Sequence, residues 1–566
     1  MSEGQRACEL GQRLRDFCAQ QPDKPAYTFY RRHNAEGDVM TWQEMWAAAA
    51  AVYAALKARG VTQGQGIFLF CEEERAFIVG LIGTWMAGAV AIPASGNFSK
   101  NAKQRNDHIL TSSKAEVILH DLSEQRADIF ADYSDRRVVA LQEVLIAYEE
   151  EAAAAAPAVT AAAAAPAVTA SGDGSAAIAQ APTPHARLLQ YTSGSTTAPK
   201  PVFLDASTIA VGCRTLQRAY GLDQRSVGAS WLPLHHDMGL VGFVFALLWV
   251  GGSVALMKPS TFIQKPAKWL EIINRHRATI TAAPNFAFDR LCAVLEAEDM
   301  EGCDLSCLET LIFGGEPVRL ETYNRLVETL EPLGLRRAAI APSYGLAEVM
   351  LLASSGQTAQ GPAFSDQNSE APVANLGAVV PSLQLSILNP ETGEACADGQ
   401  VGQIYLTGEG AGLVIGDGED WRNHQGSRLI DTGDMGFLMN EELFITGRSA
   451  NKIIIRGRNF YAEDIETLIV SSQESGLFAG VAAFSFEDNG AEKICILVEL
   501  EKRDRTLNLE SLLEQVSGGL GARPEIVATV PRYSLPRTSS GKVRRHLVSA
   551  AFAEKQLKCE VLFQHD

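Results

Sequence analysis

The chain has 566 residues, of which 46% are hydrophobic and 20% charged, and its formal net charge is −18. It is too long for one simple domain and has an ordinary globular composition. The acidic balance argues against nucleic acid as the main partner, and any anionic substrate must therefore meet a locally basic site. The ten cysteines are scattered and no signal peptide opens the chain, so we expect a reduced, cytoplasmic protein.

Apolar runs typical of strands alternate with helical stretches through most of the chain. We expect a helix over residues 41–60 and strands over 66–70, 89–93, 277–284, 308–315 and 336–343. Such alternation predicts an α/β fold with largely parallel sheets and packed helices. From about residue 447 the pattern changes to that of a small α+β domain. We therefore predict a large domain over residues 1–446 and a small, mobile C-terminal domain over residues 447–566.

Three segments need separate interpretation. Residues 153–161 and 162–170 are identical copies of AAAAPAVTA, and we interpret 151–184 as a low-complexity surface linker. Residues 238–257 carry no charge, but Gly251 and Gly252 divide them, which predicts a buried helix and a strand, with no transmembrane segment. The terminal EVLFQHD resembles part of a viral-protease cleavage sequence, so it is left out of the fold prediction.

Residues 191–200, YTSGSTTAPK, combine hydroxyl side chains, a glycine and a lysine between two expected strands. A Walker P-loop leads into a helix and has a different spacing, so this loop is not one. Hydroxyl groups and backbone N–H groups can still surround phosphates, with Lys200 beside them. A surface turn rich in Ser and Thr is the structural alternative.

Several further motifs carry polar residues at the expected ends of strands. WLPLHHDMGLVG (231–242) contains a His-His-Asp run, although an HHxxxD acyltransferase motif places its aspartate further on. LIFGGEPVR (311–319) predicts a strand that runs into a glycine turn. APSYGLAEVML (342–352) predicts a strand followed by a helix that carries Glu348. Ligands in open α/β sheets lie beyond such strand ends, where Tyr344 could stack on a base and Glu348 could bind Mg²⁺.

Two motifs follow near the C-terminus. LIDTGDMGF (429–437) places two aspartates around an expected glycine turn. LPRTSSGKVRR (535–545) is a second loop of hydroxyl residues and glycine, which ends at Lys542. Each motif alone has a structural explanation.

In this order and at these spacings, the motifs resemble the adenylate-forming superfamily of acyl-CoA synthetases, luciferases, peptide-synthetase adenylation domains and fatty acyl-AMP ligases. The resemblance runs from about residue 25 to residue 550. LLQYTSGSTTAPK, WLPLHHDMGL, AAPNFAF and IIIRGRNFYAEDIE are most similar to the fatty acyl-AMP ligase branch.

The resemblance implies that the protein uses ATP and Mg²⁺, and it implies roles for individual residues. Phosphate contacts would come from Thr192, Ser193, Gly194, Ser195, Thr196 and Lys200. The remaining nucleotide contacts would come from Gly315 and Glu316 at the adenine, Tyr344 and Gly345 beside it, and Asp434 and Arg448 at the ribose. His236 would lie beside the reacting carboxylate, Glu348 would bind Mg²⁺, and Lys542 would bridge the carboxylate and the α-phosphate.

The implied activity is ATP-dependent conversion of a fatty acid to acyl-AMP with release of pyrophosphate. The acyl group would then pass to the phosphopantetheine thiol of a separate acyl carrier protein. The alternatives are transfer to CoA, activation of an amino acid or aryl acid (for which Asp237 could bind an ammonium group), and an inactive scaffold homologue.

The sequence departs from the family pattern at several positions. Thr197 and Pro201 replace usual glycines, and Ala450 replaces a charged hinge residue. The apolar segments 242–252 and 282–288 could line an acyl tunnel or could be ordinary core. Residues 351–377, only 27 in number, look short for the insertion that acyl-AMP ligases usually carry there.

Overall fold

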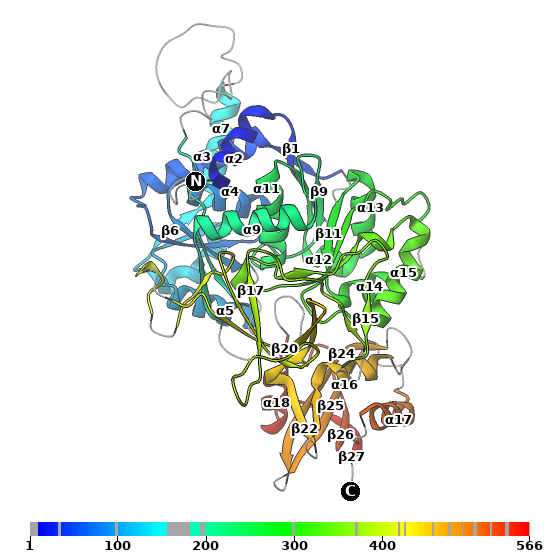
Figure 1. Ribbon diagram of the computed structural model, residues 1–566. Coiled ribbons are helices and arrows are strands. Elements are labelled where there is room, and N and C mark those ends of the chain that lie inside the picture. Colours follow the sequence, from blue (N-terminus) through cyan, green and yellow to red (C-terminus); the bar gives the residue numbers. More distant parts are fainter. Residues whose placement is uncertain are drawn as a thin grey trace.

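The computed structural model describes residues 9–31, 36–96, 100–155, 181–192, 199–296, 300–367, 372–416, 419–423, 426–455, 458–471, 473, 477–488, 491–501, 507–520, 523–537 and 543–564. These residues form a mixed α/β structure with parallel-rich sheets and a separate C-terminal domain, which lies below the rest of the molecule in Figure 1. The predicted fold class is confirmed.

One large sheet has the strand order β14-β13-β12-β11-β9-β10-β1-β2. Its pairs from β13 to β1 are parallel, whereas β14 and β2 add antiparallel edges. The strands are β1 (Pro25–Tyr30), β2 (Asp38–Thr41), β9 (Val227–Ser230), β10 (Ser253–Met257), β11 (Ile280–Ala283), β12 (Thr310–Gly314), β13 (Ile340–Tyr344) and β14 (Ser354–Ser355). The carboxyl ends of β9, β12 and β13 therefore meet at one edge, where the predicted site residues follow.

The second large sheet has the order β19-β8-β7-β4-β3-β5-β6. Its strands are β3 (Gly66–Cys71), β4 (Val90–Ser95), β5 (Val117–His120), β6 (Arg137–Ala140), β7 (Leu188–Tyr191), β8 (Pro201–Leu204) and β19 (Leu413–Val414). Strands β7 and β8 pair antiparallel, with Tyr191 opposite Pro201. The hydroxyl-rich loop therefore connects two neighbouring strands, as its flanking sequences predicted.

Helices cover both large sheets (Figure 1). They are α2 (Glu9–Gln20), α3 (Trp42–Ala58), α4 (Glu74–Met86), α5 (Lys100–Ser112), α6 (Glu124–Ala127), α7 (Leu141–Ala155), α9 (Ala206–Ala219), α10 (Asp237–Gly239), α11 (Ala246–Val250), α12 (Pro259–Gln264), α13 (Ala267–His276), α14 (Asn285–Leu295) and α15 (Leu320–Leu330), with short 3₁₀ turns at Asp128–Tyr133, Glu331–Leu333 and Arg337–Ala339. Helix α3 begins at a capping box in which Thr41 and Glu44 bond each other's backbone N–H groups.

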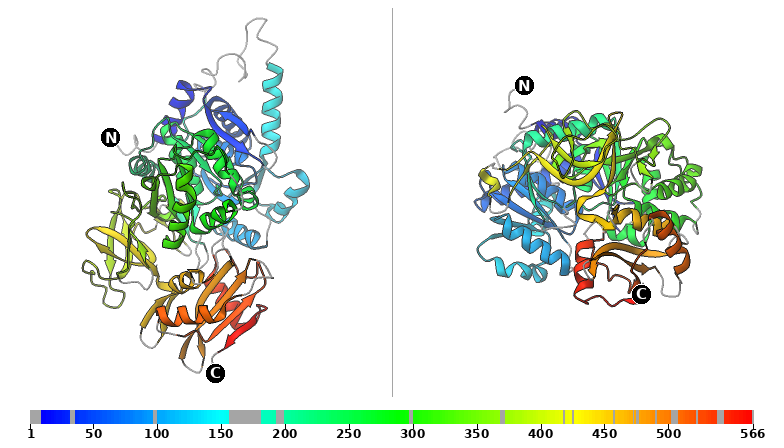
Figure 2. Two further views of the ribbon diagram at one scale, coloured as in Figure 1. Left: turned by 90° about the vertical axis from the view of Figure 1, so that its right-hand side faces the viewer. Right: turned by 60° about the horizontal axis from the view of Figure 1, so that its bottom comes forward.

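Smaller sheets complete the fold. Strands β15 (Phe364–Ser365) and β16 (Val373–Ala374) pair with each other, and a separate sheet has the order β17-β18-β20-β21. The latter contains β17 (Gln384–Leu388), β18 (Gly402–Thr407), β20 (Ile430–Met439) and β21 (Glu442–Arg448). Figure 2 shows this sheet beside the body and next to the C-terminal domain. It therefore leads the chain from the large sheets to the last domain.

The C-terminal domain has its own sheets and hydrophobic clusters. Its elements are β22 (Lys452–Ile455), β23 (Arg458–Tyr461), α16 (Ala462–Ser471), β24 (Phe478–Asp488), β25 (Ala491–Leu500), α17 (Leu509–Leu520), β26 (Ile526–Val530), α18 (Arg545–Ala553) and β27 (Glu560–Gln564). Strand β27 contains most of the EVLFQHD sequence and pairs antiparallel with β26. The terminal sequence that was left out of the prediction thus forms an edge strand.

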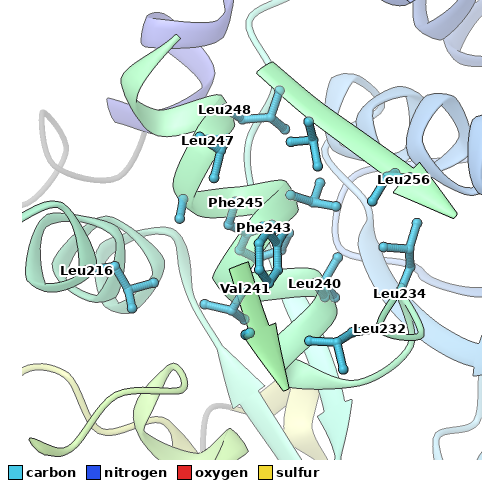
Figure 3. Close-up of a cluster of buried hydrophobic side chains, with 14 of the residues drawn as sticks. Leu216, Leu232, Leu234, Leu240, Val241, Phe243, Phe245, Leu247, Leu248 and Leu256 are labelled. Atoms are coloured by element: carbon cyan, nitrogen blue, oxygen red, sulfur yellow. The ribbon is translucent and has the colours of Figure 1, made fainter. Parts of the chain in front are cut away.

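The uncharged segment 238–257 is a buried helical region followed by strand β10, as predicted. Its first part is a π-helical turn, Leu240–Phe245, which continues into α11. Every residue from Leu240 to Val250 is buried. Figure 3 shows six of these side chains in one cluster with Leu216 of α9 and Leu256 of β10, namely Leu240, Val241, Phe243, Phe245, Leu247 and Leu248. This segment is therefore packed as core. No helix among the described residues is both long and apolar enough to cross a bilayer.

The predicted linker over residues 151–184 is ordered at both ends. Helix α7 continues to Ala155, and Figure 2 shows it standing out from the body. At the other end, Ala181 is buried and its carbonyl oxygen accepts a hydrogen bond from Arg15. The linker boundaries were therefore too wide, while residues 156–180, which include most of the repeat, lie outside the described residues.

Candidate functional site

Three predicted nucleotide contacts form one hydrogen-bonded group. Tyr344, the last residue of β13, donates its hydroxyl hydrogen to Asp434 Oδ2 at 2.7 Å. Arg448 Nε donates to Asp434 Oδ1 at 2.9 Å, and the two residues are direct partners across β20 and β21. Asp434 is buried, whereas the Arg448 side chain is partly exposed. The structure thus brings these predicted residues together from two sheets.

Electrostatics fixes the protonation of this group. Burial raises the pKa of Tyr344 far above its usual value, and the charge of Asp434 adds to the shift. Burial also raises the pKa of Asp434, but Arg448 and the Tyr344 hydroxyl act in the opposite direction. The carboxylate raises the pKa of Arg448 in turn. Tyr344 therefore remains a hydrogen-bond donor and Arg448 remains a cation.

Glu348 lies close to this group but on a different local structure from the one predicted. The sequence predicted a helix after β13, yet Glu348 lies in a single 3₁₀ turn, Ala347–Val349. The turn stops because Met350 and Leu351 both have left-handed backbone angles, φ 54° and 81°. The chain folds back so closely that a Cβ on Gly345 would lie 1.5 Å from the Leu351 carbonyl oxygen. Gly345 is therefore required for this reversal.

The carboxyl group of Glu348 has an unusually high pKa. Burial raises its pKa to about 7, and the neighbouring carboxylate of Asp237 adds to the shift. Two acidic side chains from different segments, after β9 and after β13, therefore face one region. A cation bound there would be stabilised by both carboxylates.

The predicted adenine-pocket turn lies directly after β12. Gly315 has φ +82°, a left-handed conformation that favours glycine, and a Cβ there would be 2.7 Å from Met238 Cε. Met238, which directly follows the His-His-Asp segment, is thus packed close to Gly315. The predicted strand and glycine turn are both confirmed at this position. The Phe286 backbone N–H donates to Glu316 Oε1 at 3.3 Å.

Asn285 is a structural residue of the site that sequence reasoning missed. Its Nδ2 donates to the Pro317 carbonyl at 2.8 Å, and its Oδ1 accepts from the Arg319 N–H at 3.0 Å. The segment AAPNFAF was interpreted only as a possible apolar wall. An asparagine at the first position of a helix after a buried strand was the available signal, since such a side chain often bonds nearby backbone.

His236 is buried, and its backbone carbonyl accepts a hydrogen bond from the Leu240 N–H at the start of the π-helical turn. The rings of His235 and His236 have centroids 4.6 Å apart. Asp237 Oδ1 accepts a hydrogen bond from the Met238 N–H at 2.8 Å.

The expected glycine turn at 429–437 is instead part of the continuous strand β20, which contains Gly433 in a left-handed conformation at φ 68°.

The two ends of the hydroxyl-rich loop are hydrogen-bonded to each other. The Thr192 N–H donates to the Lys200 carbonyl at 3.0 Å, and the Lys200 N–H donates to Thr192 Oγ1 at 3.2 Å. Lys200 itself is exposed. The other predicted phosphate contacts, Ser193, Gly194, Ser195 and Thr196, lie outside the described residues, as does Lys542.

The described residues contain no group of three or more His, Cys, Asp or Glu side chains that could hold a metal ion. Glu348 and Asp237 nevertheless suit Mg²⁺, which usually takes one or two carboxylates and completes its coordination with phosphates and water. Burial is the main cause of the raised pKa of Glu348, and the negative charges of Asp237 and Asp434 add to it, so a bound cation would stabilise the ionised carboxylate. The residues therefore fit a metal that arrives with a nucleotide.

Comparison with known proteins gives concordant matches. A model of the family described as AMP-binding enzyme matches residues 14–414. The medium-chain-fatty-acid–[acyl-carrier-protein] ligase JamA of Moorena producens is 29% identical, covering 95% of this chain and 94% of that protein. The 4-hydroxyphenylalkanoate adenylyltransferase of Mycobacterium tuberculosis is 30% identical, covering 95% and 90%. A solved structure from work on fatty acyl-adenylate ligases of E. coli and L. pneumophila has a TM-score of 0.79 and 25% identity, covering 97% and 98%.

Proposed function

Because the chain belongs to the family of AMP-binding enzymes, we propose that it activates a fatty acid with ATP, forming acyl-AMP and releasing pyrophosphate. The observation that carries this proposal is the group formed by Tyr344, Asp434 and Arg448, with Glu348 beside it. Tyr344 and Arg448 are the last residues of their strands and Glu348 follows β13, which places them at strand ends, where nucleotides bind in open α/β folds. Fatty-acid ligases among the full-length relatives support the substrate class.

The described site residues would contact different parts of the nucleotide. Asp434 would accept hydrogen bonds from the ribose hydroxyls, while Arg448 keeps its carboxylate charged and oriented. Tyr344 would stack on the adenine, and Gly315 and Glu316 would lie at the edge of the base. Glu348 would hold Mg²⁺, which reduces the repulsion between the phosphates and the incoming carboxylate.

The chemical step joins a carboxylate oxygen of the fatty acid to the α-phosphorus. The bond from that phosphorus to the β-phosphate oxygen breaks, and pyrophosphate leaves with the electron pair. Two anions must approach each other, so positioning and charge compensation provide most of the catalysis. We assign His236 to the side of the reacting carboxylate, Lys542 to both reacting groups, and Thr192 with the following hydroxyl residues and Lys200 to the phosphates.

We propose further that the chain divides between residues 446 and 447, so that the C-terminal domain moves between the two half-reactions. Arg448 lies immediately after this boundary and makes its ion pair with Asp434 on the other side of it. The described cysteines are all free thiols, which supports action in the reducing cytoplasm.

An exchange assay between labelled pyrophosphate and ATP tests the acid substrate directly. Fatty acids of increasing chain length, 4-hydroxyphenylalkanoic acids and amino acids are each supplied with Mg²⁺. Exchange with fatty acids is expected, and exchange with amino acids alone would contradict the proposal. The 4-hydroxyphenylalkanoic acids test the aryl-acid alternative, and they are included because one full-length relative is a 4-hydroxyphenylalkanoate adenylyltransferase.

We propose the phosphopantetheine thiol of a separate acyl carrier protein as the acceptor, with CoA as the alternative. The full-length match to an acyl-carrier-protein ligase supports the carrier. The test supplies ATP, Mg²⁺ and a fatty acid, followed by a holo carrier protein or CoA. Acyl transfer to the carrier is expected. Rapid acyl-CoA formation without transfer to several carriers would assign the protein to the CoA ligases instead.

A further inference from the structure

Arg105 lies where the chain enters the hydroxyl-rich loop. It belongs to α5, and its Nη2 donates to the carbonyl oxygen of Tyr191, the last residue of β7, at 3.2 Å. The same helix also contacts both ends of the loop. Ser112 Oγ lies 2.9 Å from the Tyr191 hydroxyl, and His108 Nε2 lies 3.3 Å from the Pro199 carbonyl oxygen. Arg105 is therefore held at the base of the loop by its hydrogen bond to Tyr191 and by the contacts of its helix with the loop ends.

His235 lies beside the same strand end. Its backbone carbonyl accepts a hydrogen bond from Gln190 Nε2 at 2.9 Å. Its ring nitrogen Nε2 is buried and has no hydrogen-bond partner among the described residues. Burial lowers the pKa of His235 to about 3, and the charge of Arg105 contributes to that shift. His235 is thus a neutral, unsatisfied imidazole next to a cation.

Arg544 approaches this place from the C-terminal domain. Its backbone N–H donates to the Pro536 carbonyl at 2.7 Å, and the residue immediately precedes α18. Its Nε is buried without a hydrogen-bond partner among the described residues. Burial lowers the pKa of Arg105 to about 10, and the positive charge of Arg544 adds to the effect. The positive charge of Arg544 is therefore near enough to Arg105 to disfavour the charged form of its guanidinium.

Neither guanidinium forms an ion pair with any residue that the structure describes. Nearby arginines differ, because Arg448 is paired with Asp434 and Arg545 is paired with both Glu463 and Glu466. Partly desolvated like charges without a counter-charge destabilise the folded chain. An anion between them would remove this cost, and a guanidinium presents paired N–H groups that match phosphate oxygens.

We propose that Arg105, Arg544 and His235 form an anion site, here named the interdomain anion site, that binds the pyrophosphate part of ATP and the pyrophosphate product. This inference rests on the proposed function, because it assumes that the loop between Tyr191 and Lys200 binds the phosphates of ATP. A phosphodiester, as in phosphopantetheine, has the same chemistry and is the rival ligand. The position at the base of the loop favours pyrophosphate.

The site would also couple the ligand to domain position. Arg105 and Arg544 come from the two domains, so bound pyrophosphate would hold them together. Its departure would restore their repulsion and favour the movement that admits the acceptor thiol.

The test uses the full chain with Arg105→Gln and Arg544→Gln, each removing one positive charge. Lys103→Gln on the exposed side of α5 and Lys558→Gln after α18 are matched controls, because both lysines are exposed. In fatty-acid-dependent exchange, KM for pyrophosphate should rise about tenfold or more in each arginine variant. KM for the fatty acid should stay unchanged, and both controls should behave as the wild type.

Binding is measured separately by the shift in melting temperature that pyrophosphate causes. The shift should be reduced in either arginine variant, and the double variant should lose little more than one single variant because both groups share one ligand. This readout does not need a fatty acid. If the wild type catalyses no exchange with any acid, the proposed function fails, while the thermal shift still tests the anion site.

Two results would overturn the inference. The first is an unchanged KM for pyrophosphate together with an unchanged thermal shift in both arginine variants. The second is a defect confined to thiol transfer from presynthesised acyl-AMP, which would assign the residues to the phosphodiester of the acceptor.

Discussion

The Tyr344 hydroxyl donates a 2.7 Å hydrogen bond to Asp434, although 90 positions separate the two residues in the chain. Tyr344 ends strand β13 of a large sheet, whereas Asp434 lies within β20 of a different sheet. Asp434 is also the partner of Arg448, the last residue of β21, at the proposed start of the C-terminal domain. One carboxylate therefore connects the large sheet with the segment that leads to the last domain.

Replacing Asp434 with asparagine should weaken ATP binding strongly. The change removes the carboxylate that accepts from both Tyr344 and Arg448, and it leaves the buried part of the site without its negative charge. Charged hydrogen bonds of this kind correspond to a rise of about 10- to 100-fold in KM for ATP. Pyrophosphate exchange with ATP varied at a saturating fatty acid measures the effect.

Asp431→Asn is the matched control on the same strand. Asp431 is exposed and accepts hydrogen bonds from Gly433 and from Gln403, neither of which is a proposed nucleotide contact. It should leave KM for ATP close to the wild-type value. Equal effects of the two substitutions on KM for ATP would mean that Asp434 affects ATP binding only by stabilising the sheet.

Activity should rise with pH through the region near 7, because Glu348, the proposed Mg²⁺ ligand, must be ionised to bind the cation. Its pKa in the free protein is about 7, so kcat/KM for ATP should fall about tenfold per pH unit well below that value. Glu348→Gln should abolish most activity and remove this limb of the profile. A wild-type profile that is flat between pH 5 and about 7 would contradict the assignment.

The same group makes stability depend on pH in the opposite sense. A carboxyl whose pKa is higher in the folded chain than its ordinary 4.5 favours folding in its protonated form. Its contribution is complete below 4.5 and is lost as the pH rises through about 7. Glu348→Gln should therefore gain melting temperature relative to the wild type at pH 8 but not at pH 4.5.

Gly345→Ala should distort the turn between Tyr344 and Glu348. The added Cβ would meet the Leu351 carbonyl oxygen at 1.5 Å, so the backbone must move. Such overpacking costs about 1–3 kcal/mol in the free energy of unfolding, and adenylate formation should fall with it. Gly518→Ala in α17 is the control, since nothing lies within 4 Å of its Cβ position and alanine favours a helix. A stable and fully active Gly345→Ala variant would exclude a role for this close approach.

Arg545 should be important for the stability of the C-terminal domain. It bonds Glu463 at 2.7 Å and Glu466 through two hydrogen bonds, and all three side chains are largely buried. Arg545→Met leaves both glutamates without their cation, which typically costs about 3–5 kcal/mol. Chemical denaturation measures the loss. Adding Glu463→Gln and Glu466→Gln should recover much of it, and a triple variant as unstable as Arg545→Met would contradict this explanation.

The sequence predicted the large sheets well because their strands are apolar runs bounded by turn residues. The segments around β3, β4, β7, β8 and β11 to β13 all formed as expected. The helix proposed after β13 was wrong, since local pattern cannot reveal that Met350 and Leu351 adopt left-handed angles under packing. The turn expected around Gly433 was also wrong, because a strand that contains a left-handed glycine has a local sequence typical of a turn.

Within the site, motif order identified which residues belong together but not how they contact one another. The hydrogen bond from Tyr344 to Asp434 forms because two sheets lie next to each other in the fold. The hydrophobic periodicity of the sequence does not show which sheets are neighbours. Arg105 was missed because its helix is amphipathic and polar, and a single arginine there resembles a solvated side chain. Only the missing ion pair and the nearby Arg544 distinguish it.

Lys542 should be needed for adenylate formation and not for thiol transfer. Its position was predicted from the sequence motif and lies outside the described residues, but Arg545, three positions later, is anchored to α16. If the C-terminal domain moves as proposed, Lys542 would move away from the reacting groups with it. Removing a charged contact to the transition state typically lowers the rate about 10²–10³-fold.

The half-reactions separate the two roles. Lys542→Ala should lose most adenylate formation, measured by pyrophosphate exchange, yet transfer the acyl group from presynthesised acyl-AMP to a thiol at near the wild-type rate. Lys555→Ala, an exposed lysine beyond α18, controls for loss of positive charge in the same domain. Adenylate formation by Lys542→Ala at the wild-type rate would remove this residue from the reaction. Equal loss of both half-reactions would instead mean that the substitution disturbs the domain, because a contact made only during adenylation cannot affect a step that starts from acyl-AMP.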